Sequence, residues 1–93
     1  MKTKYKNVFK ELGFSEEDSA NLEARSRLMI LLEHEIKKMG LSQAQAAKLL
    51  GVKPPRISEI MSGRIDKFSV DLLITYLSRL GKAVQFKLAR KAA

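Results

Sequence analysis

The segment GVKPPRISEI, residues 51–60, holds both prolines of the chain side by side, between two runs that otherwise predict helix. A residue that precedes proline is driven out of the α region, so Lys53 and Pro54 are expected to be non-helical. Pro55 suits the first position of a helix, because the N–H that it lacks has no partner there. The segment therefore predicts a short turn, opened at Gly51, and a new helix that begins at Pro55.

The rest of the chain predicts helices whose ends are marked by serines and glycines. Ser15 is a good N-cap, and the three acidic residues after it favour the positive end of a helix. Ser42 and Gln45 have the spacing of a capping box. Ser69 is placed to cap a last helix, which Gly81 ends. The four predicted helices span residues 16–39, 42–50, 55–62 and 69–80.

The two ends of the chain differ from this helical pattern. Residues 1–14 have little helical periodicity and predict a flexible N-terminal arm. The apolar patch of this arm consists of Val8, Phe9, Leu12 and Phe14. Residues 82–93 begin with alternating apolar and polar side chains, which is typical of a half-buried strand. The expected organisation is an arm over 1–14, a helix-turn-helix domain over 15–81, and a C-terminal dimerisation strand and tail over 82–93.

A single strand is not stable on its own, and no other segment of the chain predicts β structure. The simplest partner is the same strand of a second copy, paired across a two-fold axis. The alternative is a tail that frays or docks flat on its own helices. The residues expected at the dimer interface are Val84, Phe86 and Leu88.

Two of the predicted helices have the spacing of a pair packed across a tight turn. With Gln43 counted as position one, Ala47 stands at position five, where a larger side chain would push the helices apart. Gly51 at position nine supplies the positive φ that the turn needs. Ile57 and Ile60, at positions fifteen and eighteen, are expected to point into the core. Two further core residues are expected: Leu49 and Leu50.

This register resembles the helix-turn-helix of phage repressor and Cro-like regulators, the XRE family. The resemblance implies a mainly α fold, a lambda-repressor-like helical DNA-binding domain of four to five helices. In this fold a short C-terminal β-strand would pair in a dimer. An ordinary helical hairpin within a small bundle is the alternative.

In this docking mode the N-terminal part of the second helix enters the major groove of DNA. The polar, exposed candidates to face DNA there are Lys53, Arg56, Ser58 and Glu59. Arg56 is the best base reader, because a guanidinium pairs bidentately with guanine. Glu59 either accepts from cytosine N4 or orients Arg56, and the second role is favoured. Pro54 and Pro55 stand where many family members carry polar base-reading side chains. Prolines cannot donate a hydrogen bond there but can pack on a thymine methyl. Recognition would then depend more on the shape of the DNA.

Backbone phosphates are expected to meet residues on either side of the second helix, which set affinity rather than sequence choice. Gln43 resembles the family's phosphate-clamping glutamine, and Ser62 follows the recognition helix. Arg64 and Lys67 are either phosphate contacts or solvated loop charges. The full predicted DNA-binding set is Gln43, Lys53, Pro54, Pro55, Arg56, Ser58, Glu59, Ser62, Arg64 and Lys67.

The likeness extends over about residues 7–88, in segments such as NVFKELGF and GLSQAQAAKLLGV. These segments look like small XRE-type regulators that include HigA-like antitoxins. The resemblance implies a homodimer that binds a pseudo-palindromic double-stranded operator and represses its own operon. In antitoxin members it also implies a partner, a small ribosome-dependent RNase toxin. The apolar patch of the arm is a candidate toxin contact, and packing on the chain's own long helix is the alternative.

Composition favours a polyanionic partner over catalysis. The net charge is +8, and residues 15–40 are net acidic whereas the segments before and after them are net basic. The chain has no cysteine, no phosphate-cradling glycine loop and no metal-ligand spacing, and its one histidine, His34, lies between two glutamates. We therefore expect no enzyme activity, no metal and no cofactor. A helical protein-interaction module, or a regulator without a toxin partner, remains the alternative.

The expected location is the bacterial cytoplasm, on the nucleoid. No apolar run approaches the ~20 residues of a membrane span. The start of the chain, MKTKYKNVFK, lacks the apolar core of a signal peptide. We therefore expect no contact with a membrane.

Overall fold

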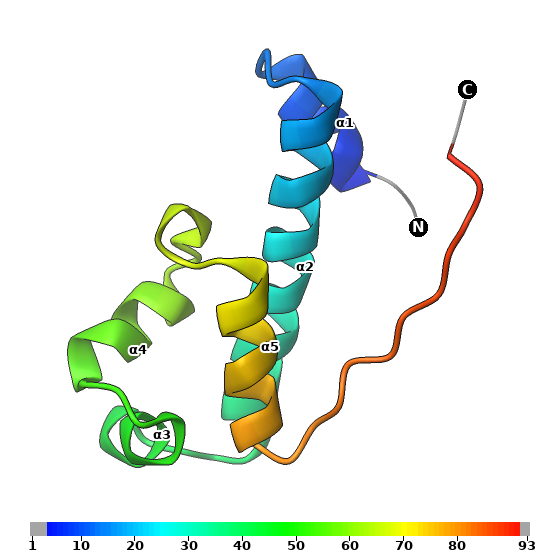
Figure 1. Ribbon diagram of the computed structural model, residues 1–93. Helices are drawn as coiled ribbons and strands as arrows, with labels where there is room; N and C mark the ends of the chain where they lie inside the picture. The colour runs from blue at the N-terminus through cyan, green and yellow to red at the C-terminus, as the bar shows by residue number, and fades with distance from the viewer. Residues whose placement is uncertain (1–3, 92–93) are drawn as a thin grey trace.

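The computed structural model describes the backbone of residues 4–91 and the side chains of residues 8–91. Within that range the chain is mainly α-helical, as predicted, and its longest helix runs through the middle of the molecule (Figure 1). The helices are α1 (Lys4–Glu11), α2 (Glu16–Lys38), α3 (Gln43–Leu50), α4 (Pro54–Met61) and α5 (Val70–Arg79), and a 3-10 turn, η1 (Ile65–Lys67), precedes α5.

Polar caps determine where three of these helices begin. The hydroxyls of Ser15 and Ser42 accept hydrogen bonds from the amides of Asp18 and Gln45, each at 3.1 Å. The Gln45 side chain accepts from the Ser42 amide at 2.9 Å, which completes the predicted capping box. Ser69 caps α5 in the same way. Each such cap stabilises its helix by about 1 kcal/mol, and all three predicted starts are confirmed.

The helix α2 is the scaffold of the molecule and packs against α1, α4, η1 and α5. Its buried residues recur on one face, as the periodicity predicts, and the other helices close over that face. Leu49 was expected in the core and is 45% exposed instead, whereas Leu50 is fully buried as expected. The core consists of Leu28, Met29, Leu32, Ile36, Ala46, Ala47, Leu50, Ile57, Ile60, Phe68, Leu73, Tyr76, Leu77 and Leu80.

The N-terminal segment differs from the expected arm, because residues 4–11 form the helix α1, which packs against α2. Phe9 is half-buried, and its ring meets the ring of Phe14 edge-on at 6.3 Å. An isolated helix of this length is marginal in water, so contact with α2 supplies its stability. Three apolar side chains of the patch remain exposed: Val8, Leu12 and Phe14.

The predicted C-terminal strand does not form in the single chain. Residues 82–91 are neither helix nor strand, and no strand is present anywhere between residues 4 and 91. This tail runs back beside α2 toward α1 (Figure 1). Lys82 and Lys91 form ion pairs with Glu35 at 3.6 Å and Glu16 at 3.7 Å. An extended segment needs a second strand for its backbone groups, and the described part of the chain provides none.

The three predicted dimer residues have different surroundings in the tail. Val84 is half-buried against the core. Phe86 and Leu88, by contrast, are 80% and 99% exposed. The single chain therefore leaves two large apolar side chains of the tail uncovered.

Candidate nucleic-acid interface

The turn between α3 and α4 has the geometry that the sequence register predicts. Gly51 adopts the left-handed conformation, with φ 71° and ψ 35°, and its amide donates to the carbonyls of Ala47 and Lys48. Ala47 is buried where the two helices meet, and Ile57 and Ile60 fill the core beneath α4. The helix-turn-helix arrangement therefore follows from one small residue, one glycine and two buried isoleucines.

The helix α4 begins one residue earlier than predicted. Lys53 is its N-cap, in an extended conformation, and Pro54 and Pro55 occupy its first two positions. The expectation that Pro54 is non-helical is therefore wrong by one position, since a first-turn residue without an amide donor loses no hydrogen bond. Lys53 and both prolines are exposed, and so are Ser58 and Ser62 further along the chain.

Arg56 was expected to be exposed and is half-buried against its own protein. Its Nη1 donates to Glu59 Oε1 at 3.1 Å, and its Nη2 donates to the carbonyl of Lys67 at 3.2 Å. Its Cζ lies 4.0 Å from the centroid of the buried Phe68 ring, a cation–π contact. Burial lowers the pKa of Arg56, but contacts with the Tyr76 phenol and Glu59 outweigh it, so the pKa is raised. The guanidinium thus fastens α4 to the segment before α5.

Glu59 links two basic side chains on this side of the molecule. It accepts from Arg56, and its Oε2 lies 3.5 Å from Lys67 Nζ. The hydrogen bond from Arg56 lowers the pKa of Glu59, and the charge of Lys67 acts in the same direction. Arg56 and Glu59 are therefore in direct contact in the free protein.

The residues that follow α4 are also engaged within the chain. Arg64 donates to both carboxylate oxygens of Asp66, at 3.2 and 3.1 Å, and this hydrogen bonding lowers the pKa of Asp66. The Ser62 hydroxyl donates to the carbonyl of Ser58 at 2.9 Å. Gln43 is the exposed first residue of α3. The predicted phosphate contacts are therefore exposed side chains, and Arg64 and Lys67 have carboxylate partners in the free protein.

Two arginines that the sequence did not single out hold this interface in place. Arg25 on α2 donates through Nη1 to the carbonyls of Ile65 and Phe68, at 3.3 and 3.5 Å. Arg79 on α5 donates to the carbonyl of Leu50, the last residue of α3. The sequence could have indicated a structural role for Arg25, because this charged residue precedes Leu28 by three positions and so lies on the apolar face of α2.

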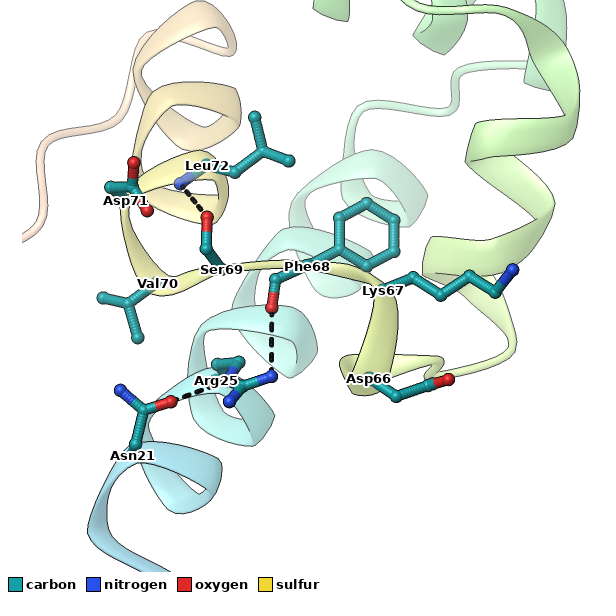
Figure 2. Close-up of a pocket in the computed structure, with 9 residues that line it drawn as sticks. All are labelled: Asn21, Arg25, Asp66, Lys67, Phe68, Ser69, Val70, Asp71 and Leu72. Carbon is teal, nitrogen blue, oxygen red and sulfur yellow. Dashed lines mark hydrogen bonds between the residues drawn. The ribbon is translucent and has the colours of Figure 1, made fainter. Parts of the chain in front are cut away.

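An open groove of about 570 Å³ lies between α2 and the segment around η1 and the start of α5. Figure 2 shows Arg25 reaching across it from α2 to the Phe68 carbonyl, while Ser69 caps α5 beside it. Arg25 is in turn held by Asn21, whose Oδ1 lies 2.8 Å from Arg25 Nε. The groove is thus bridged by a contact that fixes the loop after α4.

Among the residues that the structure describes, no cluster of three or more His, Cys, Asp or Glu side chains is placed to hold a metal ion. None of the helices between residues 4 and 91 is long and apolar enough to cross a membrane.

Comparison with known proteins agrees with this geometry. A family model described as a helix-turn-helix domain matches residues 8–89. A solved structure described as a "Putative XRE Family Transcriptional Regulator" is 32% identical to this chain, with a TM-score of 0.73, over 80% of this chain and 83% of the other. No curated protein matches the chain. Because the family model spans both helices of the turn and the scaffold around them, this chain belongs to the helix-turn-helix domain family.

Proposed function

We propose that this protein is a sequence-specific DNA-binding transcriptional regulator that acts as a repressor in the bacterial cytoplasm, on the nucleoid, and has no catalytic role. The observation that carries the proposal is the exposed start of α4, presented beyond a tight turn by a helix pair of helix-turn-helix register. The similarity to a structure described as an XRE-family regulator supports it. In this mode α4 enters the major groove, and Lys53, Gln43 and the loop after α4 face the phosphates.

The repressor is proposed to act as a homodimer on a pseudo-palindromic operator. Phe86 and Leu88 are exposed, and the backbone of residues 82–91 lacks a partner strand within the described chain. Pairing two tails across a two-fold axis would satisfy both the apolar side chains and the backbone groups. Such a dimer would read half-sites about 34 Å apart.

We also propose that this repressor is the antitoxin of a toxin–antitoxin pair. This proposal rests on the sequence resemblance to HigA-like antitoxins and on an exposed apolar surface of the N-terminal segment. Val8, Leu12 and Phe14 remain exposed although α1 packs on α2. Figure 1 shows α1 near the end of α2 that lies away from α3. A small RNase toxin bound there would leave the start of α4 free. A toxin encoded beside this protein, and pulled down by it but not by a Leu12→Glu variant, would support the assignment.

A charge reversal tests the DNA-binding proposal against a matched control. Lys53→Glu places an acidic side chain at the start of α4, whereas Lys10→Glu makes the same charge change on α1. We expect Lys53→Glu to lower the affinity for duplex DNA at least tenfold, because it loses a phosphate contact and adds repulsion. Lys10→Glu should bind nearly as wild type does.

Fluorescence anisotropy with a labelled duplex of selected sequence measures both variants. Equal losses for the two substitutions would mean that only net charge matters, and the proposed interface would be wrong. No binding by the wild type would favour the protein-interaction module instead.

A further inference from the structure

The outermost stripe of α4 is small and uncharged. Pro55 and Ser58 are exposed and lie three residues apart, which places them on one side of the helix, and the exposed C-cap Ser62 follows four residues later. Pro54 is exposed beside them at the first helical position. Such a surface can lie close to the base edges, because no long side chain holds it away from them.

The charged residues of α4 flank this stripe and are turned toward the protein. Arg56 contacts Phe68 and donates to Glu59 and to the Lys67 carbonyl. To pair with guanine in the major groove, Arg56 would have to give up these contacts. Glu59, in turn, is held by Arg56 and Lys67. The first turn of α4 therefore meets the groove with apolar rings rather than with a guanidinium.

Neither Pro54 nor Pro55 has an amide that can donate to a base or a phosphate. Their exposed surface consists of ring methylenes, and the complementary group on base edges in the major groove is the 5-methyl of thymine. Resting on the proposed function, we propose that α4 reads thymine methyl groups through Pro54 and Pro55. The preferred site carries thymine under the start of α4, and Arg56 acts as a positioning residue that holds α4 against Phe68.

Deoxyuridine substitution tests this directly, because it removes the methyl group and keeps the base pair. A duplex selected from a random pool by the wild-type protein is resynthesised with each thymine replaced in turn. We expect about fourfold weaker binding at one or two positions in each half-site, the factor that corresponds to about 0.8 kcal/mol per buried methyl group. Anisotropy at constant salt measures each affinity.

A thermodynamic cycle assigns the effect to the prolines. In the variant Pro54→Ser/Pro55→Ser the deoxyuridine penalty should vanish at those positions. Both prolines are exposed, so the core is unchanged, and circular dichroism checks the helix content of the variant. The measurement on wild-type protein needs no variant and stands if the variant fails to fold.

Two results would overturn the inference and leave DNA binding intact. One is a selected duplex that binds equally well with every thymine replaced. The other is a penalty confined to 7-deazaguanine, which lacks the N7 acceptor, because this would assign readout to Arg56 on guanine. If no duplex is selected over random DNA, the proposed function itself fails together with the inference.

Discussion

At the scale of single residues, Arg56 joins parts of the chain that are distant in sequence. Its guanidinium meets a carboxylate of α4, a carbonyl of η1 and the ring of Phe68 just before α5. The sequence marks Arg56 as a basic residue near the start of the second helix. It does not show that a buried aromatic twelve residues later takes up the guanidinium, since that contact depends on how the loop after α4 folds back.

Replacement of Arg56 by alanine is therefore expected to weaken the fold. We expect the free energy of unfolding to fall by about 1–2 kcal/mol, because a partly buried cation–π contact and two charge-assisted hydrogen bonds are lost. Urea denaturation measures this loss. Arg56→Lys should recover part of it, since it keeps a cation over the Phe68 ring, and an alanine variant as stable as wild type would contradict the positioning role.

Gly51 permits a matched test of the turn. Gly51 and Gly40 both have positive φ, 71° and 68°, so alanine at either position should cost about 1–2 kcal/mol of strain. A Cβ at Gly51 would also lie 3.3 Å from Nη1 of Arg79, whereas a Cβ at Gly40 would have no described atom within 4 Å apart from those of Gly40 and its chain neighbours. Thermal unfolding should therefore show a larger loss for Gly51→Ala. Equal losses would mean that Arg79 moves aside without cost.

Among the secondary-structure elements, the sequence predicts those helices whose ends are marked by capping residues, glycine or proline. α2, α3 and α5 begin at serine caps and carry an apolar face, and Gly51 and the prolines separate α3 from α4. The helix α1 was missed although Tyr5, Val8, Phe9 and Leu12 recur at the i, i+3, i+4, i+7 spacing of an apolar helix face. It has no serine cap like those of α2, α3 and α5, and contact with α2 stabilises it. Apolar and polar side chains alternate in the tail as in a strand. A strand forms only beside a second strand, and residues 4–91 of the single chain provide none.

Substitutions in the tail, residues 82–91, test whether it forms the dimer interface. Phe86→Glu should abolish the proposed dimer, because it places a charge in the middle of the proposed strand pair. Gln85→Glu adds the same charge to the neighbouring position, which alternation places on the other side of the strand. Sedimentation velocity at micromolar concentration should find a dimer for wild type and Gln85→Glu. A dimer that survives Phe86→Glu would place the interface elsewhere.

At the scale of the whole molecule, the acidic first turn of α2 and the start of α4 lie in different regions (Figure 1). The basic residues near α4 are partly neutralised in the free protein, because Glu59 pairs with Arg56 and Lys67, and Asp66 pairs with Arg64. DNA phosphates would compete with these carboxylates for the basic side chains. The Arg64–Asp66 pair is exposed, and an exposed ion pair contributes little to stability, so competition for Arg64 is weak.

The salt dependence of duplex binding tests whether this protein binds DNA through α4 and its flanks. With Lys53, Arg64 and Lys67 each meeting one phosphate in both copies of a dimer, six contacts predict a slope of about −5 in a plot of log Kobs against log salt concentration. Anisotropy titrations between about 50 and 200 mM salt measure this slope. A linear fall of about that steepness would support a DNA-binding regulator that uses α4 and its flanks. Binding that does not change with salt, or no binding at the lowest salt, would contradict it.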